Sequence, residues 1–264
     1  MEQHPALTYT SYLHLDDLLA AQEPLSEGPE HDELLFIVIH QVYELWFKEM
    51  LHELDYLKGL LERRDDMRAQ HTLKRVLTIL KVVVAQIDVL ETMTPLEFLT
   101  FRERLESGSG FQSYQFRELE FLLGMRHQAA LSRYPEGSPA RGRLEKRLAE
   151  PSLWDAFLHY LVAKGHTVPA SVLSRDRSGV VESAPELHPL LIHVYKNDPT
   201  VRALCERLVD LDEGFQEWRY RHVKMVERTI GTRRGTGGSM GAAYLKTTLD
   251  RPFYPDLWAI RTEL

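Results

Sequence analysis

A histidine occupies one position of an otherwise apolar helical stripe in the last quarter of the chain. From residue 201 onward, apolar side chains recur at alternating steps of three and four, and His222 stands where this stripe predicts Leu or Phe. Imidazole is the most common metal ligand among side chains. Two interpretations follow: a core histidine bonded to a backbone carbonyl, or an axial ligand to a cofactor between helices. Because the chain has no CxxCH motif, a haem would be bound non-covalently.

A second histidine lies on an aromatic helix face in the first half of the chain. Phe36, His40, Tyr43 and Phe47 are spaced i, i+4, i+7 and i+11, so one side of a helix carries three aromatic rings and an imidazole. This face is either an aromatic core stripe with one satisfied histidine or the wall of an aromatic pocket. In the second case His40 could hydrogen-bond a substrate.

Polar groups for the rim of such a pocket come from a helix end and a glycine-rich segment. Arg102 lies one helical turn beyond Phe98, and it is either a solvated charge or a clamp that binds a carboxylate through two parallel hydrogen bonds. The segment 231–241, GTRRGTGGSMG, lacks the lysine and the residue order of a phosphate-binding loop. We interpret it as a hinged loop that closes over a small ligand, with Thr236 and Ser239 as hydrogen-bonding groups.

Long helical segments must position these residues. Helical periodicity predicts them over 32–61, from residue 73 to 90 and from residue 201 to 225. Asp32, Thr94 and Asp198 are candidate helix caps, the last two directly before a proline. Shorter helices are expected over 11–21, 112–125, 141–149, 152–164, 186–195 and 242–249. Since no segment alternates with a period of two, we predict an all-α fold: a single domain, 1–264, whose long antiparallel core helices enclose the pocket.

The composition excludes several classes of protein. Among 264 residues, 44% are apolar, and the net charge of −7 disfavours a protein that binds nucleic acid by neutralising phosphates. One cysteine, Cys205, cannot build a zinc or iron–sulfur site. No apolar run approaches the roughly 18 residues that a membrane-spanning helix needs, and the first residues do not form a signal peptide. We therefore expect a cytoplasmic protein with neither nucleic acid nor membrane as a partner.

Taken in order, motifs along most of the chain resemble the tryptophan 2,3-dioxygenase family. The segments that carry the resemblance are LTYTSYLHLDDLL at 7–19, HDELLFIVIHQVYELWFKEMLHELD at 31–55, VLETMTPLEFLTFRERL at 89–105, SGFQSYQFRELEFLLG at 109–124, YRHVKMVERTIG at 220–231 and RGTGGSMGAAYL at 234–245. The SGFQSYQFR and GTGG stretches are long and unusual enough to make the match specific. Residues 126–197 carry no such motif.

The resemblance implies a non-covalent haem b and assigns residues around it. His222 matches the proximal iron ligand of the family, and Ser109, Gly110 and Gly235 match positions close to the haem. His40 matches the distal histidine, the predicted catalytic residue, which hydrogen-bonds the indole N–H and orients the substrate.

The resemblance also implies the substrate, L-tryptophan, and the way in which it is bound. Phe36 and Phe98 match positions that line the indole pocket, Arg102 matches the arginine that pairs with the substrate carboxylate, and Thr236 matches the threonine that binds the amino-acid end. The implied reaction inserts both atoms of O₂ across the indole C2–C3 bond and yields N-formylkynurenine.

A further implication concerns assembly. Tyr9 and Tyr12 match two tyrosines that complete the pocket of a neighbouring subunit in the homotetramer of the family. The segment 1–20 is therefore expected to contact a second copy of the chain.

One loop departs from the usual pattern of the family. The stretch that usually reads IGFKRGTGGSSG is IGTRRGTGGSMG here, so Thr232 replaces an aromatic residue and Met240 a small one. An alternative is thus a specialised relative that oxygenates a substituted tryptophan, such as a methylated one, and transfers one oxygen atom. Two other classes rank lower: a non-catalytic haem or gas sensor, which would have no use for Arg102 and Thr236, and a structural helical bundle.

Overall fold

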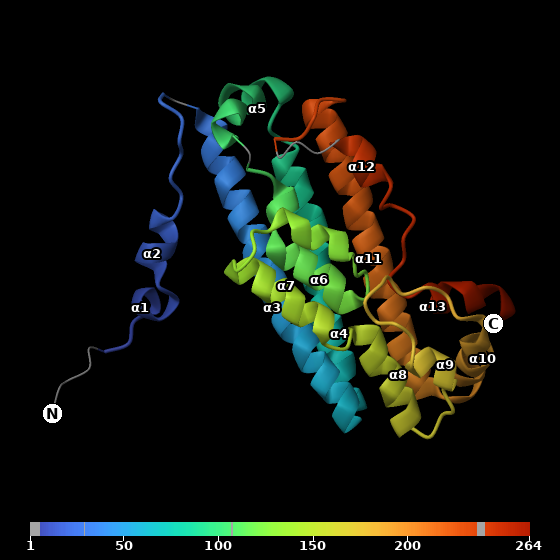
Figure 1. Ribbon diagram of the computed structural model, residues 1–264. Helices are drawn as coiled ribbons and strands as arrows, with labels where there is room; N and C mark the ends of the chain where they lie inside the picture. Colours follow the sequence, from blue (N-terminus) through green and yellow to red (C-terminus); the bar gives the residue numbers. More distant parts are fainter. Residues whose placement is uncertain (1–5, 29, 107, 237–240) are drawn as a thin grey trace.

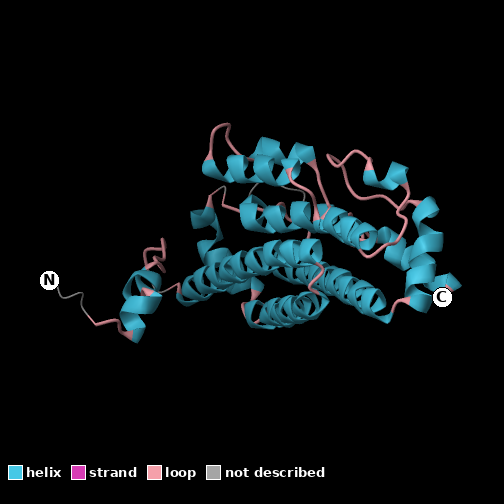
Figure 2. Ribbon diagram, turned by 90° about the horizontal axis from the view of Figure 1, so that it is seen from below, coloured by secondary structure: helices cyan, strands magenta, loops and turns pink. Residues whose placement is uncertain are grey.

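The computed structural model describes residues 6–28, 30–106, 108–236 and 241–264, and every regular element in these ranges is a helix (Figures 1 and 2). The longest are α3 (His31–Arg63), α4 (Asp66–Leu90) and α11 (Pro199–Ile230). Helix α4 packs against both of the others. Helix α3 runs antiparallel to both, whereas α4 and α11 run in the same direction (Figure 1). The prediction of an all-α fold with long core helices is confirmed.

Shorter helices cover the sides of this core. Helices α6 and α8 pack on α3, α7 packs on α6, and α10 and α12 pack on α11. Their bounds, with those of the remaining short elements, are α6 (Tyr114–Leu123), α7 (Pro139–Ala149), α8 (Leu153–Ala163), α9 (Ala170–Leu173), α10 (His188–Asn197), α12 (Ala242–Lys246), α13 (Pro255–Ala259) and the 3₁₀ turns η1 (Arg102–Leu105), η2 (Gly110–Gln112), η3 (Gln128–Arg133), η4 (Pro185–Leu187) and η5 (Ile260–Glu263).

Local sequence explains where two of the helices that carry the site begin. The Asp198 carboxylate accepts the backbone N–H groups of Thr200 and Val201, and Pro199 occupies the first position of α11. Helix α5 (Pro95–Phe101) begins with a capping box, in which the side chains of Thr94 and Glu97 accept each other's backbone N–H. Both predicted starts are confirmed.

The start of α3 differs from the prediction. The helix begins at His31, so Asp32 lies inside its first turn, and Glu30 caps it without a side-chain hydrogen bond. The chain is fixed here by the next residue instead: the buried carboxylate of Glu33 accepts the backbone N–H groups of Leu25 at 2.7 Å and Ser26 at 3.1 Å. Glu33 thereby attaches the preceding loop to the first turn of α3.

The N-terminal arm also differs from the single helix expected over 11–21. It forms α1 (Tyr9–Leu13) and α2 (Leu15–Ala20), which are separated because His14 adopts a left-handed conformation with φ 51°. The arm extends away from the helical body (Figure 1), and none of the residues of α1 and α2 is buried.

The segment 165–185, which shows no period in the sequence, lies against the body through apolar and polar contacts: Val168, Val172 and Val181 are buried in the main hydrophobic core. Arg126, only 3% exposed, donates to the backbone carbonyls of Arg177 at 2.8 Å and Leu148 at 3.1 Å. The backbone N–H of Val181 donates to the carbonyl of Gly124 at 3.1 Å. Such contacts fix an irregular segment without a hydrophobic period. A search of the described residues finds no helix with the length and hydropathy needed to cross a bilayer.

Candidate active site

A cavity of about 520 Å³ lies between the N-terminal half of α3, the end of α4, α5, and the C-terminal half of α11. Residues of the segments 108–120, 235–236 and 241–248 contribute to its remaining walls. This volume lies in the range typical of small-molecule and cofactor sites. Most of the residues that the sequence predicted for the site line this cavity: Phe36, His40, Phe98, Arg102, Ser109, Gly110, His222, Gly235 and Thr236.

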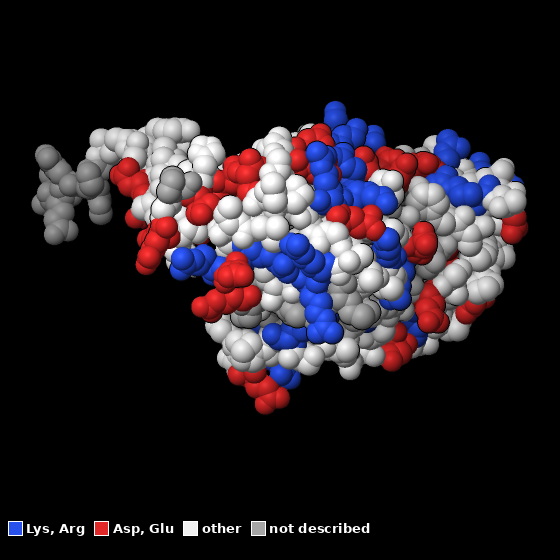
Figure 3. Space-filling model, turned by 90° about the horizontal axis from the view of Figure 1, so that it is seen from above, with Lys and Arg blue, Asp and Glu red and all other residues white. Residues whose placement is uncertain are grey.

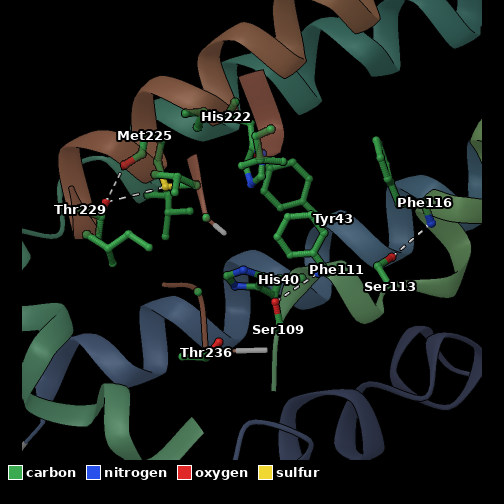
Figure 4. A pocket seen from close by; sticks show the side chains of 18 of the residues that line it. His40, Tyr43, Ser109, Phe111, Ser113, Phe116, His222, Met225, Thr229 and Thr236 are labelled. Carbon is green, nitrogen blue, oxygen red and sulfur yellow. Dashed lines mark hydrogen bonds between the residues drawn. The ribbon is translucent and has the colours of Figure 1, made fainter. Parts of the chain in front are cut away.

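His40 projects from α3 toward the cavity (Figure 4), and one of its ring nitrogens already has a hydrogen-bond partner. Its Nδ1 lies 2.7 Å from the carbonyl oxygen of Phe36, one helical turn earlier. A carbonyl only accepts hydrogen bonds, so Nδ1 must carry the proton, and Nε2 remains as an acceptor. Burial lowers the pKa of His40 more than the Phe36 carbonyl and the Glu44 carboxylate raise it. The ring is therefore neutral at pH 7, with a lone pair on Nε2.

His222 projects from α11 on the opposite side of the cavity (Figure 4) and is held differently. No hydrogen bond joins its ring to another residue of the described ranges, and its imidazole stacks on Trp218 with ring centroids 5.0 Å apart and an angle of 6° between the planes. Burial lowers the pKa of His222 to about 4, and His40 acts in the same direction. A neutral imidazole is the form that binds metals.

The surroundings of His222 fit an iron that arrives within a porphyrin better than a bare ion. In the part of the chain that the structure describes, no group of three or more His, Cys, Asp or Glu side chains could hold a metal ion. The wall near His222 is apolar and includes Met225 and Val226. On another wall, a Cβ added to Gly110 would meet no atom within 4 Å, so the backbone there faces open space.

Aromatic rings form the wall of the cavity next to His40. The centroid of the Phe36 ring lies 4.1 Å from that of the His40 ring. It lies 5.9 Å and 5.6 Å from the ring centroids of Phe98 and Phe101. Phe98 and Phe101 meet edge to face at 5.5 Å. Edge-to-face and tilted contacts of this kind are favourable for aromatic pairs and hold the rings in place. The wall offers a firm apolar surface to a flat ligand.

The rim of the cavity is polar. The guanidinium of Arg102 donates to the backbone carbonyl of Arg234, and the hydroxyl of Thr236 donates to that of Gly108. These hydrogen bonds join the segment after α5 to the glycine-rich segment after α11. Basic and acidic side chains lie side by side on the face that carries α5 and α12 (Figure 3). The predicted role of Ser239 and the substitution at Met240 fall outside the described residues.

The inner end of the cavity holds charged residues that the sequence interpretation missed. Arg117 forms an ion pair with Glu120, and the Arg219 guanidinium lies 3.6 Å from the same carboxylate. All three are buried and line the cavity. Arg219 also donates to the carbonyl of Arg251 at 2.8 Å. One signal was available: Arg117 and Glu120 stand three residues apart in QFRELE, the spacing of an ion pair on one helix face.

Tyr9 and Tyr12 do not reach this cavity within the chain. They lie on α1 and are 75% and 68% exposed. Their predicted contact with the pocket of a neighbouring subunit stays a prediction.

Comparison with known proteins connects this geometry to a family. The model of the family "Tryptophan 2,3-dioxygenase" matches residues 1–161 and 182–264. A protein named tryptophan 2,3-dioxygenase from Herpetosiphon aurantiacus is 61% identical over 259 residues, which cover 98% of this chain and 99% of the relative. Proteins of the same name from Anaeromyxobacter sp. (strain K) and Caulobacter vibrioides are 58% and 46% identical, and each alignment covers 98% of this chain and 97% or 98% of the relative.

This chain belongs to the tryptophan 2,3-dioxygenase family. The resemblance noted from the motifs is thereby confirmed, and the match extends further than those motifs did. Of the stretch 126–197, only residues 162–181 lie outside the match. They contain α9 and most of the irregular segment that Arg126 holds. The predicted site residues that line the cavity all fall within the matched ranges.

Proposed function

We propose that this chain cleaves the indole C2–C3 bond of L-tryptophan with O₂ to give N-formylkynurenine, using a non-covalent haem b bound through His222. The observation that carries this proposal is the pair of neutral histidines on opposite sides of one aromatic cavity, in a chain of this family. Both oxygen atoms enter the product, so the reaction needs no external electron donor for its overall balance.

Four features of the cavity support haem binding. Its volume of about 520 Å³ and its apolar lining suit a large flat cofactor, and the open space beside Gly110 leaves room next to the backbone. His222 supplies a neutral imidazole whose ring nitrogens form no hydrogen bond with a described residue. A bound ferrous haem supplies the capacity to bind and activate O₂.

His40 recognises the indole N–H in this proposal. Because Phe36 fixes the proton on Nδ1, the only hydrogen bond that Nε2 can make is one that it accepts. An indole has a single N–H donor, so the tautomer of His40 matches an unsubstituted indole nitrogen and disfavours an N-methylated one. The nitrogen lone pair of the indole drives electron density toward C3, so His40 orients the substrate without acting as a strong base. Phe36 and Phe98 hold the indole plane.

Arg102 and Thr236 bind the amino-acid end of the substrate at the rim. The guanidinium of Arg102 has five N–H donors, of which the Arg234 carbonyl occupies one, so others remain for a carboxylate. When the substrate binds, the hydroxyl of Thr236 leaves its hydrogen bond to the Gly108 carbonyl and forms one with the substrate instead. Together these groups distinguish an amino acid from a plain indole. Ser109, Gly110 and Gly235 line the cofactor.

We further propose a homotetramer in which Tyr9 and Tyr12 complete the pocket of a neighbouring subunit, and a cytoplasmic location. Exposed apolar side chains on the arm support an interface: Leu7, Tyr9, Tyr12 and Leu19 are 68–76% exposed. Light scattering should give the mass of four chains for the full-length protein. A monomer that retains full activity would contradict the shared pocket.

The reaction is tested by mass spectrometry of the product formed under ¹⁸O₂ from L-tryptophan by the reduced, haem-loaded protein. The proposal predicts N-formylkynurenine with two ¹⁸O atoms. A product with one ¹⁸O atom, or much faster turnover of a methylated tryptophan, would favour the specialised alternative. If the protein binds O₂ but its absorption spectrum does not change when amino acids are added, the sensor alternative would be favoured.

A further inference from the structure

Trp218 stacks on the imidazole ring of His222. It precedes His222 by one turn of α11, and the two ring planes are nearly parallel, 6° apart, with centroids separated by 5.0 Å. Trp218 itself lines the cavity. No role was assigned to Trp218 by the motifs that identified the site.

This stacking contact is found at a histidine for which a hydrogen bond from the second ring nitrogen would be usual. A histidine that binds a metal almost always donates its second ring N–H to a carbonyl, a carboxylate or water, which fixes the ring. Elsewhere in this chain helical histidines make such a bond one turn back: His40 with the Phe36 carbonyl at 2.7 Å, and His159 with the Asp155 carbonyl at 2.8 Å. Within the described ranges, His222 makes no such bond with the carbonyl of Trp218.

Packing holds Trp218 itself in place. The centroid of its indole ring lies 4.8 Å from the ring centroid of Phe116. The ring centroid of Phe116 in turn lies 5.4 Å from that of Phe47 on α3. The indole Nε1 of Trp218 is buried and has no hydrogen-bond partner in the described part of the chain. The Tyr43 hydroxyl is the polar group that interacts with this side chain, and the flat surface of the indole ring is the part that meets His222.

We propose that Trp218 is a positioning residue for His222: its stacked ring fixes the plane of the imidazole in place of the carbonyl hydrogen bond that His40 and His159 make. This inference rests on the proposed function, because it assigns His222 to a haem iron. It has two consequences. The ligand keeps the donor strength of a neutral imidazole, which no hydrogen-bonded carbonyl increases. A second aromatic ring can replace the indole, whereas an aliphatic side chain cannot.

The test compares Trp218→Leu, which removes the ring, with Trp218→Phe, which keeps a ring but no N–H. Tyr220→Leu is the matched control, since Tyr220 is an aromatic residue of the same helix that is 52% exposed. The readouts are the Fe–His stretching band of the ferrous protein by resonance Raman spectroscopy and the rate of haem transfer to apomyoglobin. We expect Trp218→Leu to shift or broaden the band and to release haem about 10- to 100-fold faster, the usual effect of losing a group that orients a ligand. Trp218→Phe and Tyr220→Leu should match the parent chain.

An unchanged band and release rate in Trp218→Leu would overturn the inference, as would equal changes in Trp218→Leu and Trp218→Phe. If Trp218→Leu fails to fold by circular dichroism, Trp218→Met takes its place, because methionine fills irregular space without a ring. The proposed function fails separately: in that case the parent chain itself would show no Fe–His band.

Discussion

The two long helices that carry the histidines of the cavity, α3 and α11, hold them by different means. On α3 a hydrogen bond to the Phe36 carbonyl fixes the tautomer of His40 and leaves a single acceptor. On α11 the ring of His222 is stacked on Trp218, and no hydrogen bond to a described residue occupies its nitrogens. Burial lowers the pKa of both rings, so both are neutral. The same uncharged side chain thus keeps one hydrogen-bond acceptor in one wall, and in the other wall has no ring nitrogen bonded to a described residue.

The starts of these helices differ as well. Asp198 caps α11 by accepting N–H groups of the first turn of the same helix. Glu33, in the first turn of α3, instead accepts N–H groups of the loop that precedes α3. Helix α11 is thus fixed locally, and the start of α3 also holds the base of the N-terminal arm.

The largest effect is expected from His222→Ala. The variant loses the iron ligand, so the Soret band and turnover should both disappear. The measurement is the absorption spectrum after reconstitution with haem, followed by an assay for the product with L-tryptophan. A variant with a normal Soret band and normal turnover would remove the distinction between the two walls. His193→Ala, at a helical histidine that does not line the cavity, is the control.

Arg102→Ala should have the next largest effect. Loss of charge-assisted hydrogen bonds to the substrate carboxylate should weaken binding by about 1.5–3 kcal/mol, or roughly 10- to 150-fold in KM. Haem content should stay normal. Steady-state kinetics with Arg104→Ala as the control, an exposed arginine nearby, separate loss of binding from loss of local charge. A colourless Arg102→Ala protein would contradict the role assigned to this side chain.

His40→Ala should keep its haem and lose part of its activity. Removal of one neutral hydrogen bond should lower kcat/KM for L-tryptophan by about 2- to 12-fold, which corresponds to roughly 0.5–1.5 kcal/mol. The preference for L-tryptophan over its N1-methyl derivative should fall by the same factor, because that derivative has no N–H to donate. If the preference is unchanged in the variant, His40 does not recognise the indole nitrogen.

The smallest effect concerns the start of α3 and is confined to acid pH. Desolvation by burial raises the pKa of Glu33, but the hydrogen bonds from Ser26 and Leu25 outweigh it, and the net pKa lies below the usual 4.5. The stabilisation is therefore complete above pH 4.5 and is lost as the pH falls through the lower folded pKa.

Hydrogen exchange at the amides of Leu25 and Ser26 measures this loss. Exchange, corrected for its intrinsic pH dependence, should accelerate by about 10-fold or more below that pH. Glu33→Gln should exchange fast at neutral pH as well, whereas Asp32→Asn, in the same turn, should not. Equal protection in Glu33→Gln and the parent chain at pH 7 would show that the arm is held by something else.

Sequence predicted the fold well where local signals decide the structure. The caps at Thr94 and Asp198 and the stripe from residue 201 to 218 depend on neighbours in the chain, and the helices begin and run as they indicate. The break at His14 carries no glycine or proline and was missed. The segment 165–185 is held by Arg126, which is distant in sequence, and by the buried side chains of Val168, Val172 and Val181. Its carbonyl contacts leave no periodic pattern.

The site divides in the same way. Motifs and helical spacing identified both histidines, the aromatic wall and the rim, all of which line one cavity. The buried group of Arg117, Glu120 and Arg219 was missed, because charged residues in a helical sequence are normally exposed. They become internal in the folded protein, where Glu120 on α6 approaches Arg219 on α11. Tyr9 and Tyr12 stay predictions, since their expected contact requires a second chain.

The central claim is that the imidazole of His222 binds the iron of a haem while His40 faces the substrate. A crystal structure of the haem-loaded protein, with anomalous diffraction at the iron edge, tests it most directly. We expect an iron peak beside a ring nitrogen of His222, with the Nε2 of His40 free of iron. An iron peak beside His40, or one with the His222 ring turned away, would contradict it.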